Sequence, residues 1–230
     1  MNTSVVALVP MRHHSQRVPG KNYRSLAGRP LYHHVVENLL ACPLISEVFI
    51  DTDSPAIMED AANHFPQVRI IERPDRLRGD SIPMNDVLLH DVAQVKADLY
   101  LQTHSTNPLL RTETITRAIE ALVGQYPMYD SLFAVTRLQT RLWDKLARPI
   151  NHNPAILLQT QDLPPVFEEN SNLYIFPGSL LESRHNRIGE RPLIFEVDRL
   201  EAWDIDEELD FLIAEFLYTW RENASVGCQS

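Results

Sequence analysis

A cationic loop directly behind a short apolar run is the feature that most constrains how this chain can fold. The apolar run, residues 5–9, has the branched composition of a buried strand. The loop behind it contains Arg12, Arg17 and Lys21 and turns at Pro19-Gly20. Cations and backbone N–H groups gathered where a helix should begin favour the binding of a polyphosphate. An ordinary solvated loop is the alternative interpretation.

The loop is not a Walker A motif. Ser15 stands where that motif needs its first glycine, and Asn22 follows the lysine where the motif has Ser or Thr. A phosphate site here would therefore need a different arrangement of backbone and side chains.

Alternating strand and helix patterns predict an α/β fold. Residues 5–10, 47–51 and 98–102 are short apolar runs typical of buried strands. The remaining strand and helix patterns of this half cover residues 31–40, 55–65, 68–71, 85–96 and 112–123. This alternation predicts a mostly parallel, doubly wound sheet. Ligands bind beyond the carboxyl ends of such strands, so we expect the first loop, Thr52-Asp53 and Gln102 to converge.

The second half of the chain is less regular. Strand candidates and one apolar-faced helix follow at residues 131–136, 172–176, 193–197 and 207–220. The aromatic side chains of Phe216 and Trp220 in that helix are expected to pack internally. From residue 137 to about 176 the pattern is irregular and rich in proline, which predicts a functional excursion or a subunit contact. We expect residues 1–230 to form a single domain.

The acidic composition excludes several classes of function. A formal net charge of −10 argues against a general nucleic-acid binder, which would present a basic face. No apolar run approaches the roughly 20 residues that span a bilayer, and no signal peptide is expected. The two cysteines and nine histidines match no disulfide framework or zinc spacing. The chain is therefore predicted to be cytoplasmic, without membrane contact.

A pair of carboxylates near the end of the chain is the second chemical signal. Asp204 and Asp206 are two residues apart, so in extended backbone they share a face while Ile205 turns into the core. Two carboxylates on one face suit an oxygen-ligated Mg²⁺ that also contacts phosphate oxygens. The alternative is helix capping, in which Asp206 simply begins the last helix.

The first loop, Arg-x-x-Ser-x-Arg-x-Pro-Gly-Lys-Asn, resembles the nucleotide loop of the cytidylyltransferases that activate sialic acids. Further segments that resemble the family follow in family order: residues 26–31, Asp51-Thr-Asp-Ser54, Glu72-Arg-Pro74, residues 101–111, Gln161-Asp-Leu-Pro164 with Glu169, Asn170 and Tyr174, and Asp204-Ile-Asp206. The resemblance extends roughly from residue 5 to residue 217.

The resemblance implies a Rossmann-like nucleotidyltransferase core that transfers CMP from CTP to an acidic acceptor, with Mg²⁺ as cofactor. It also implies a homodimer, with a small dimerisation subdomain in about residues 137–176. The nucleotide contacts that it implies or suggests are Arg12, Ser15, Arg17, Lys21, Asn22, Arg73 and Asp80. Lys21, Arg12 and Asp206 are predicted to act in catalysis, and Asp204 and Asp206 to hold the metal. Candidate acceptor contacts are Gln102, His104, Asn170 and Tyr174.

Departures from the family pattern leave the acceptor open. His13-His14 replaces a flexible Gly-Gly pair, and Thr160 replaces a basic residue that some members use to meet the sialate carboxylate. The acceptor is predicted to be a 2-keto sugar acid of the sialic or nonulosonic class. The alternative is a small phosphonate such as phosphonoformate, whose charge protonated His13, His14 and His104 would offset. A second alternative is a non-catalytic nucleotide-binding protein of the same fold.

Overall fold

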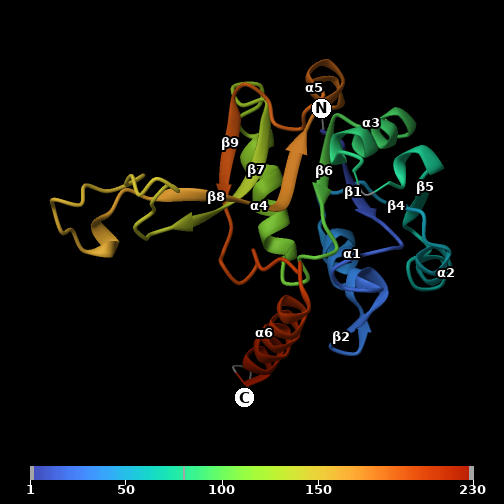
Figure 1. The fold of residues 1–230 in the computed structure, drawn as a ribbon. Coiled ribbons are helices and arrows are strands. Elements are labelled where there is room, and N and C mark those ends of the chain that lie inside the picture. Colours follow the sequence, from blue (N-terminus) through green and yellow to red (C-terminus); the bar gives the residue numbers. More distant parts are fainter. Residues whose placement is uncertain (1–2, 80, 228–230) are drawn as a thin grey trace.

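A seven-stranded sheet with helices on both faces forms the centre of the molecule (Figure 1). The computed structural model describes residues 3–79 and 81–227, with side chains through residue 224. The strands of the sheet are β1 (Val5–Met11), β4 (Glu47–Thr52), β5 (Arg69–Glu72), β6 (Leu99–Thr103), β7 (Ser131–Leu138), β8 (Val166–Phe176) and β9 (Pro192–Glu196). The helices are α1 (Leu31–Ala41), α2 (Pro55–His64), α3 (Met84–Gln94), α4 (Thr112–Val123), α5 (Gly178–Arg184) and α6 (Glu208–Gly227). Smaller elements are a two-stranded sheet of β2 (Ser25–Leu26) and β3 (Arg29–Pro30), and the 3₁₀ helices η1 (Lys21–Tyr23), η2 (Asp75–Leu77) and η3 (Thr160–Asp162).

The sheet is mostly parallel, as the sequence predicted. Its strands lie in the order β5-β4-β1-β6-β8-β7-β9. β8 is antiparallel to both of its neighbours, β6 and β7, while the other neighbouring strands pair in parallel. The carboxyl ends of β1, β4 and β6 therefore meet at one edge, where ligands bind in such folds.

Side-chain alternation along β1 explains why helices cover both faces. Val5, Ala7 and Val9 belong to one buried cluster, which also contains residues of α1, α2 and α4. Val6 and Leu8 belong to a second cluster, with residues of α3 and α5. Successive side chains of a strand point to opposite faces, so a strand that is apolar at every position must be buried on both.

The irregular excursion is shorter than the sequence suggested. β7 continues to Leu138, and β8 begins at Val166 rather than near residue 172, so the two form an antiparallel ribbon. The prediction of the shorter strand was wrong because Glu168-Glu169-Asn170 interrupts the apolar pattern, although a ribbon that meets solvent accepts polar residues. Residues 139–165, called the arm below, connect the two strands and project away from the sheet (Figure 1).

The last helix is longer than predicted and only partly packed. Phe211 and Ala214 of α6 are buried in a third cluster with Val18 of the first loop. Phe216 and Trp220 are 68% and 54% exposed, so the expectation that they pack internally is wrong for the isolated chain. None of the helices in the described residues is apolar over enough length to cross a bilayer.

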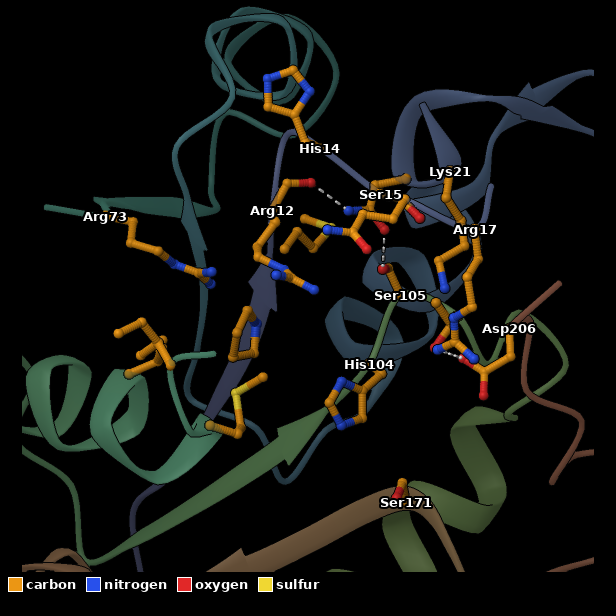
Figure 2. Close-up of a pocket in the computed structure, with 18 of the residues that line it drawn as sticks. Arg12, His14, Ser15, Arg17, Lys21, Arg73, His104, Ser105, Ser171 and Asp206 are labelled. Atoms are coloured by element: carbon orange, nitrogen blue, oxygen red, sulfur yellow. Dashed lines mark hydrogen bonds and ion pairs between the residues drawn. The ribbon is translucent and has the colours of Figure 1, made fainter. Parts of the chain in front are cut away.

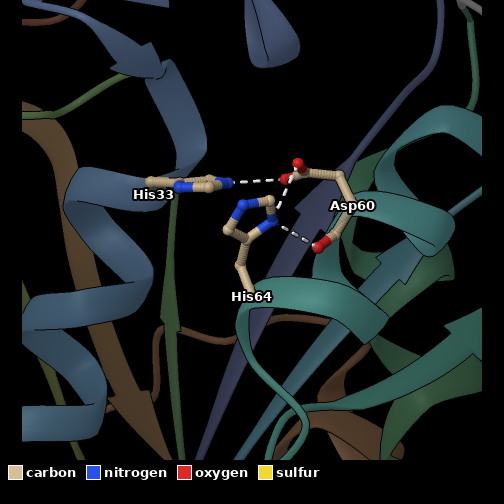
Figure 3. Close-up of side chains that lie close together, drawn as sticks. All are labelled: His33, Asp60 and His64. Carbon is tan, nitrogen blue, oxygen red and sulfur yellow. Dashed lines mark hydrogen bonds and ion pairs between the residues drawn. The ribbon is translucent and has the colours of Figure 1, made fainter.

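A carboxylate joins α1 to α2 beside the core (Figure 3). Asp60 accepts hydrogen bonds from the Tyr32 hydroxyl and from Nε2 of His33 at 2.5 Å, and Nδ1 of His64 lies 3.0 Å from its other oxygen. The side chains of His33, Asp60 and His64 lie close enough together to hold a metal ion. Because both carboxylate oxygens already have hydrogen-bond or ion-pair partners, we interpret the cluster as a brace between the helices.

Replacing Asp60 by Asn is expected to cost about 2 kcal/mol of folding free energy at pH 7, the scale of hydrogen bonds to a charged group. Burial alone would raise the pKa of Asp60, but the hydrogen bonds from His33 and Tyr32 outweigh it and lower the pKa. A carboxyl whose pKa is lowered by folding stabilises above its unfolded-state pKa of about 4, and this contribution is lost as pH falls through the folded-state pKa. The difference in unfolding free energy between the wild type and Asp60→Asn, measured with urea, should therefore shrink as the pH falls below about 4. Glu59→Gln, at an exposed neighbouring position, is the control, and an equal effect of both changes would contradict the prediction.

Candidate functional site

A cavity of about 590 Å³ lies at the carboxyl ends of β1 and β6 (Figure 2). The predicted convergence is confirmed for the first loop and the end of β4, whereas Gln102 is buried and is not among the residues that line the cavity. The backbone N–H of His13 donates to Asp53 at 2.7 Å, which joins the first loop to the end of β4. His104, Ser105 and Thr106, directly after β6, form another part of the wall.

The turn of the first loop depends on Gly20. Its φ of +66° lies in the left-handed region, which strains residues with a Cβ atom. A Cβ at this position would also lie only 2.9 Å from the Tyr23 ring. The short helix η1 follows at once, with the N–H of Arg24 donating to the Gly20 carbonyl at 2.9 Å. This turn directs Lys21 back toward the cavity.

The side chain of Asn22 fastens the loop to the sheet. Its Nδ2 donates to the carbonyl of Arg12 at 2.8 Å, and its Oδ1 accepts from the Ser105 hydroxyl at 2.7 Å. Asn22 is buried, so water does not compete strongly for these bonds. The predicted contact between Asn22 and a phosphate stays a prediction, since the structure gives the amide a bracing role.

The cations of the loop meet the predicted metal ligands across the cavity. Nζ of Lys21 donates to the carbonyl of Ile205 at 2.6 Å, between Asp204 and Asp206. Arg17 forms an ion pair with Asp206 at 2.6 Å (Figure 2). Burial lowers the pKa of Lys21, and the two carboxylates partly oppose this shift.

The two aspartates can ligate a divalent cation. Asp204 has a buried Oδ1 with no hydrogen-bond partner among the described residues, which is an expensive arrangement unless a ligand completes it. Burial raises the pKa of Asp204, while a hydrogen bond from Thr106 opposes the shift. Ile205 between them is fully buried, as predicted. Such a hard, oxygen-only donor pair fits Mg²⁺.

The alternative interpretation, in which the Asp206 side chain caps the last helix, does not match the hydrogen bonds at the start of α6. The carboxylate of Asp210 accepts the backbone N–H groups of Asp206 and Glu207, at 3.0 and 2.8 Å. Asp210 therefore accepts hydrogen bonds from the two N–H groups directly before α6. The side chain of Asp206 lines the cavity instead.

Arg73 lines the cavity but is buried and fixed from behind. Its guanidinium forms an ion pair with Asp51 of β4. Burial and the neighbouring Asp51 raise the pKa of Asp91 to about 9, so Asp91 stays protonated at neutral pH. Asp51 and Asp91 together thus contribute one negative charge beside Arg73. The residue is poised as a rigid donor rather than as a mobile counter-charge.

The remaining predicted residues fall into three groups. Arg12, Ser15 and His104 line the cavity, and Figure 2 shows the Arg12 guanidinium directed into it. Gln102, Asn170 and Tyr174 are not among its lining residues, although Gln102 hydrogen-bonds His104. Asp80 lies outside the described residues.

Sequence reasoning missed several residues of the site. Ser105 holds Asn22, and Ser171 lines the cavity from β8. Asp91 and Arg187 act from behind the wall, Arg187 by donating to Gln102 at 2.7 Å. Ser105 lies within residues 101–111, which resemble the family, but no role was assigned to it there. The other three have no chemical pattern of their own in the sequence, and only the carboxyl of Asp91 among the apolar positions of α3 could have been noticed.

Comparison with known proteins finds relatives that match most of the chain. The chain is 27% identical over 219 residues to N-acylneuraminate cytidylyltransferase A of Danio rerio, covering 92% of this chain and 50% of that protein. It is also 27% identical to CMP-N,N'-diacetyllegionaminic acid synthase of Legionella pneumophila, covering 96% of this chain and 99% of that protein. The chain thus spans half the length of the first relative and nearly all of the second.

The fold also matches a solved structure, that of CMP:2-keto-3-deoxy-manno-octonic acid synthetase complexed with CTP. The TM-score is 0.72 at 15% identity, and the match covers 95% of this chain and 100% of that one. At this identity the likeness shows a shared fold, the α/β fold with a mostly parallel sheet that the sequence predicted.

The family model described as Cytidylyltransferase matches residues 6–221, nearly the whole chain. The resemblance of the motifs is therefore confirmed at the level of the family. With a cationic first loop facing paired aspartates across one cavity, the chain belongs to the cytidylyltransferase family of nucleotidyltransferase enzymes.

Proposed function

We propose that this protein transfers CMP from CTP to a 2-keto sugar acid of the sialic or nonulosonic class and releases pyrophosphate. The observation that supports this most is the cavity in which Lys21 lies between Asp204 and Asp206. The printed names of the relatives, a neuraminate cytidylyltransferase and a legionaminic acid synthase, support the class of acceptor.

The triphosphate of CTP would lie along the first loop. Arg12, Arg17 and Lys21 supply the positive charge, and Ser15 lies on the same wall. The Arg17–Asp206 pair is largely exposed, and exposed ion pairs contribute only about 0–1 kcal/mol. Arg17 can therefore exchange its partner for a phosphate at little cost. Arg73, held by Asp51, would face the base side of the nucleotide.

Mg²⁺ would be held by Asp204 and Asp206. When bound, such an ion withdraws electron density from phosphate oxygens and orients them. The donor set fits the ion, because one carboxylate oxygen of Asp204 has no other partner in the described part of the chain.

An oxygen of the acceptor attacks the α-phosphorus of CTP as the bond to the bridging oxygen of the β-phosphate breaks. The products are the CMP-conjugate and pyrophosphate. The anomeric hydroxyl of a sugar acid must also pass its proton to a base or to a water molecule. Negative charge spreads over the phosphoryl oxygens in the transition state, so positioned cations supply most of the acceleration. Lys21 is the residue we expect to stabilise this charge.

A small phosphonate is the second candidate acceptor. Thr160 lies in η3 of the arm and is not among the residues that line the cavity, while Arg187 places an additional guanidinium behind His104. An ionised phosphonate needs no base but more positive charge nearby. His104 contributes little to that charge, because burial lowers its pKa to about 4.

The test of the proposed function is pyrophosphate release from Mg²⁺-CTP with a panel of acceptors. The panel contains sialic acid, legionaminic acid, ketodeoxyoctonate and phosphonoformate, each with and without a chelator. Release with a sugar acid supports the proposal, and release with phosphonoformate alone supports the second candidate. Tight binding of Mg²⁺-CTP without release from any acceptor would favour a non-catalytic nucleotide-binding protein.

We also propose that the protein is a homodimer that uses the arm. The arm exposes a set of large apolar side chains, namely Trp143, Leu146, Ile150, Ile156 and Leu157. The exposed face of α6 adds Leu212, Phe216 and Trp220. Apolar surface of this extent supports an interface between two copies of the chain.

Asp206→Asn is expected to lower kcat/KM by about 100-fold or more, the scale of losing one electrostatic stabiliser of a transition state. The amide can still accept a hydrogen bond from Arg17, so the change removes charge rather than shape. Pyrophosphate release measures the loss. Glu207→Gln removes a charge one residue further on, outside the cavity lining, and should leave activity near wild type. Similar activities of Asp206→Asn and the wild type would contradict the proposed metal role.

Leu157→Asp is expected to weaken the dimer about tenfold or more, since charge within an apolar interface costs several kcal/mol unless it is paired. Leu157 is 90% exposed in the single chain, so its replacement should leave the fold intact. Light scattering after size-exclusion chromatography over a dilution series reports the mass. Lys145→Asp, an exposed polar position on the same arm, is the control. A wild type that stays monomeric at high concentration would contradict the proposal.

A further inference from the structure

Arg187 lies behind the wall of the cavity, outside every predicted motif. It comes from the segment between α5 and β9. Its Nη1 donates to Oε1 of Gln102 at 2.7 Å, and its guanidinium carbon lies 3.6 Å from the centre of the Tyr174 ring. Gln102 and Tyr174 are direct partners across β6 and β8. Arg187 therefore covers both members of one cross-strand pair.

The contact with Arg187 fixes the orientation of the Gln102 amide. A guanidinium can only donate hydrogen bonds, so the atom of Gln102 that faces it must be the carbonyl oxygen. The amide nitrogen then points away, toward the Thr103 carbonyl at 3.2 Å and Nε2 of His104 at 3.0 Å. Gln102 is fully buried, and these three contacts use its oxygen and both of its hydrogens.

The orientation of Gln102 in turn fixes the tautomer of His104. An amide N–H can only donate, so Nε2 of His104 must be the acceptor and has no proton. A neutral imidazole of this kind has its proton on Nδ1. Burial lowers the pKa of His104 to about 4, and the charges of Arg187 and Lys21 act in the same direction, which is consistent with a neutral ring.

The Nδ1–H group of His104 is available to a ligand. His104 and Ser171 both line the cavity (Figure 2). Within the described residues no hydrogen bond to Nδ1 is found, whereas Nε2 faces Gln102. The proposed function assigns the cations of the first loop to the nucleotide, so this donor on the wall after β6 is left for the acceptor.

We propose that Arg187 is a positioning residue, which acts through Gln102 to present the Nδ1–H of a neutral His104 to an anionic oxygen of the acceptor. The oxygen can belong to a carboxylate or to a phosphonate. The role toward the acceptor rests on the proposed function, but the tautomer of His104 does not. A neutral donor keeps its hydrogen bond between pH 6 and 8, where an ordinary histidine changes charge.

The tautomer can be measured without any substrate. In a long-range ¹H–¹⁵N spectrum of the histidine-labelled protein at pH 7, His104 should show a protonated Nδ1 and an unprotonated Nε2. The signal is assigned by its loss in His104→Phe. Protonation of Nε2 in the wild type, alone or together with Nδ1, would overturn the inference.

Gln102→Glu is the sharpest variant, because it preserves the pairing with Arg187. A carboxylate only accepts, so it should place a proton on Nε2 of His104 and change the tautomer or charge of the ring. In Arg187→Met only the Thr103 carbonyl still orients the amide, so a fraction of His104 should change to the other tautomer. Arg191→Met, directly before β9, is the control, since Arg191 contacts the Pro127 carbonyl. An unchanged His104 signal in Gln102→Glu would overturn the proposal.

Kinetics then separate this inference from the proposed function. With an active acceptor, Arg187→Met should raise the acceptor KM about tenfold, the value of one hydrogen bond to a charged group, and leave the CTP KM unchanged. An equal rise of both KM values would contradict the positioning role. If no acceptor of the panel reacts, the proposed function fails, while the spectrum of His104 still decides the arrangement of Arg187, Gln102 and His104.

Discussion

The hydrogen bonds of the Asn22 side chain hold together the two segments on which the site depends. The amide nitrogen donates to the carbonyl of Arg12 in the first loop, and the amide oxygen accepts from Ser105, which follows β6 in the chain. A loop without this brace would leave its cations at positions set by solvent and by their own repulsion. The brace is buried, where hydrogen bonds are strong and the cost of leaving one unmade is high. The sheet thereby determines where the charged loop can place its side chains.

The charges around the cavity balance one another in two different ways. Arg17 pairs with Asp206 near solvent, so its partner can change when a phosphate arrives. Arg73 pairs with Asp51 in the interior, where separating the charges would cost several kcal/mol. The protonated Asp91 prevents a second negative charge from accumulating there. One side of the cavity is therefore adaptable and the other is fixed.

Most of the sheet and the two charged segments were predictable from sequence, because their signals are local. The apolar runs of β1, β4 and β6 and the spacing of Asp204 and Asp206 need no knowledge of distant contacts. The first half of β8 was missed because a solvent-facing ribbon has no apolar pattern. Arg187 was missed because its role depends on Gln102, which lies 85 residues away along the chain. The burial of Phe216 and Trp220 was wrongly predicted, because apolar residues at helical spacing do not identify the surface that they contact.

The reversed direction of β8 has a consequence for how such a chain can change over generations. Because β7 runs with the sheet and β8 against it, both ends of the arm leave from the edge where the cavity opens. Residues can be inserted into or deleted from the arm without shifting the pairing of any strand in the body. The arm can thus vary in length and composition while the sheet that positions the first loop keeps its strand pairing. A single scaffold can in this way acquire a different hairpin without rebuilding its cavity.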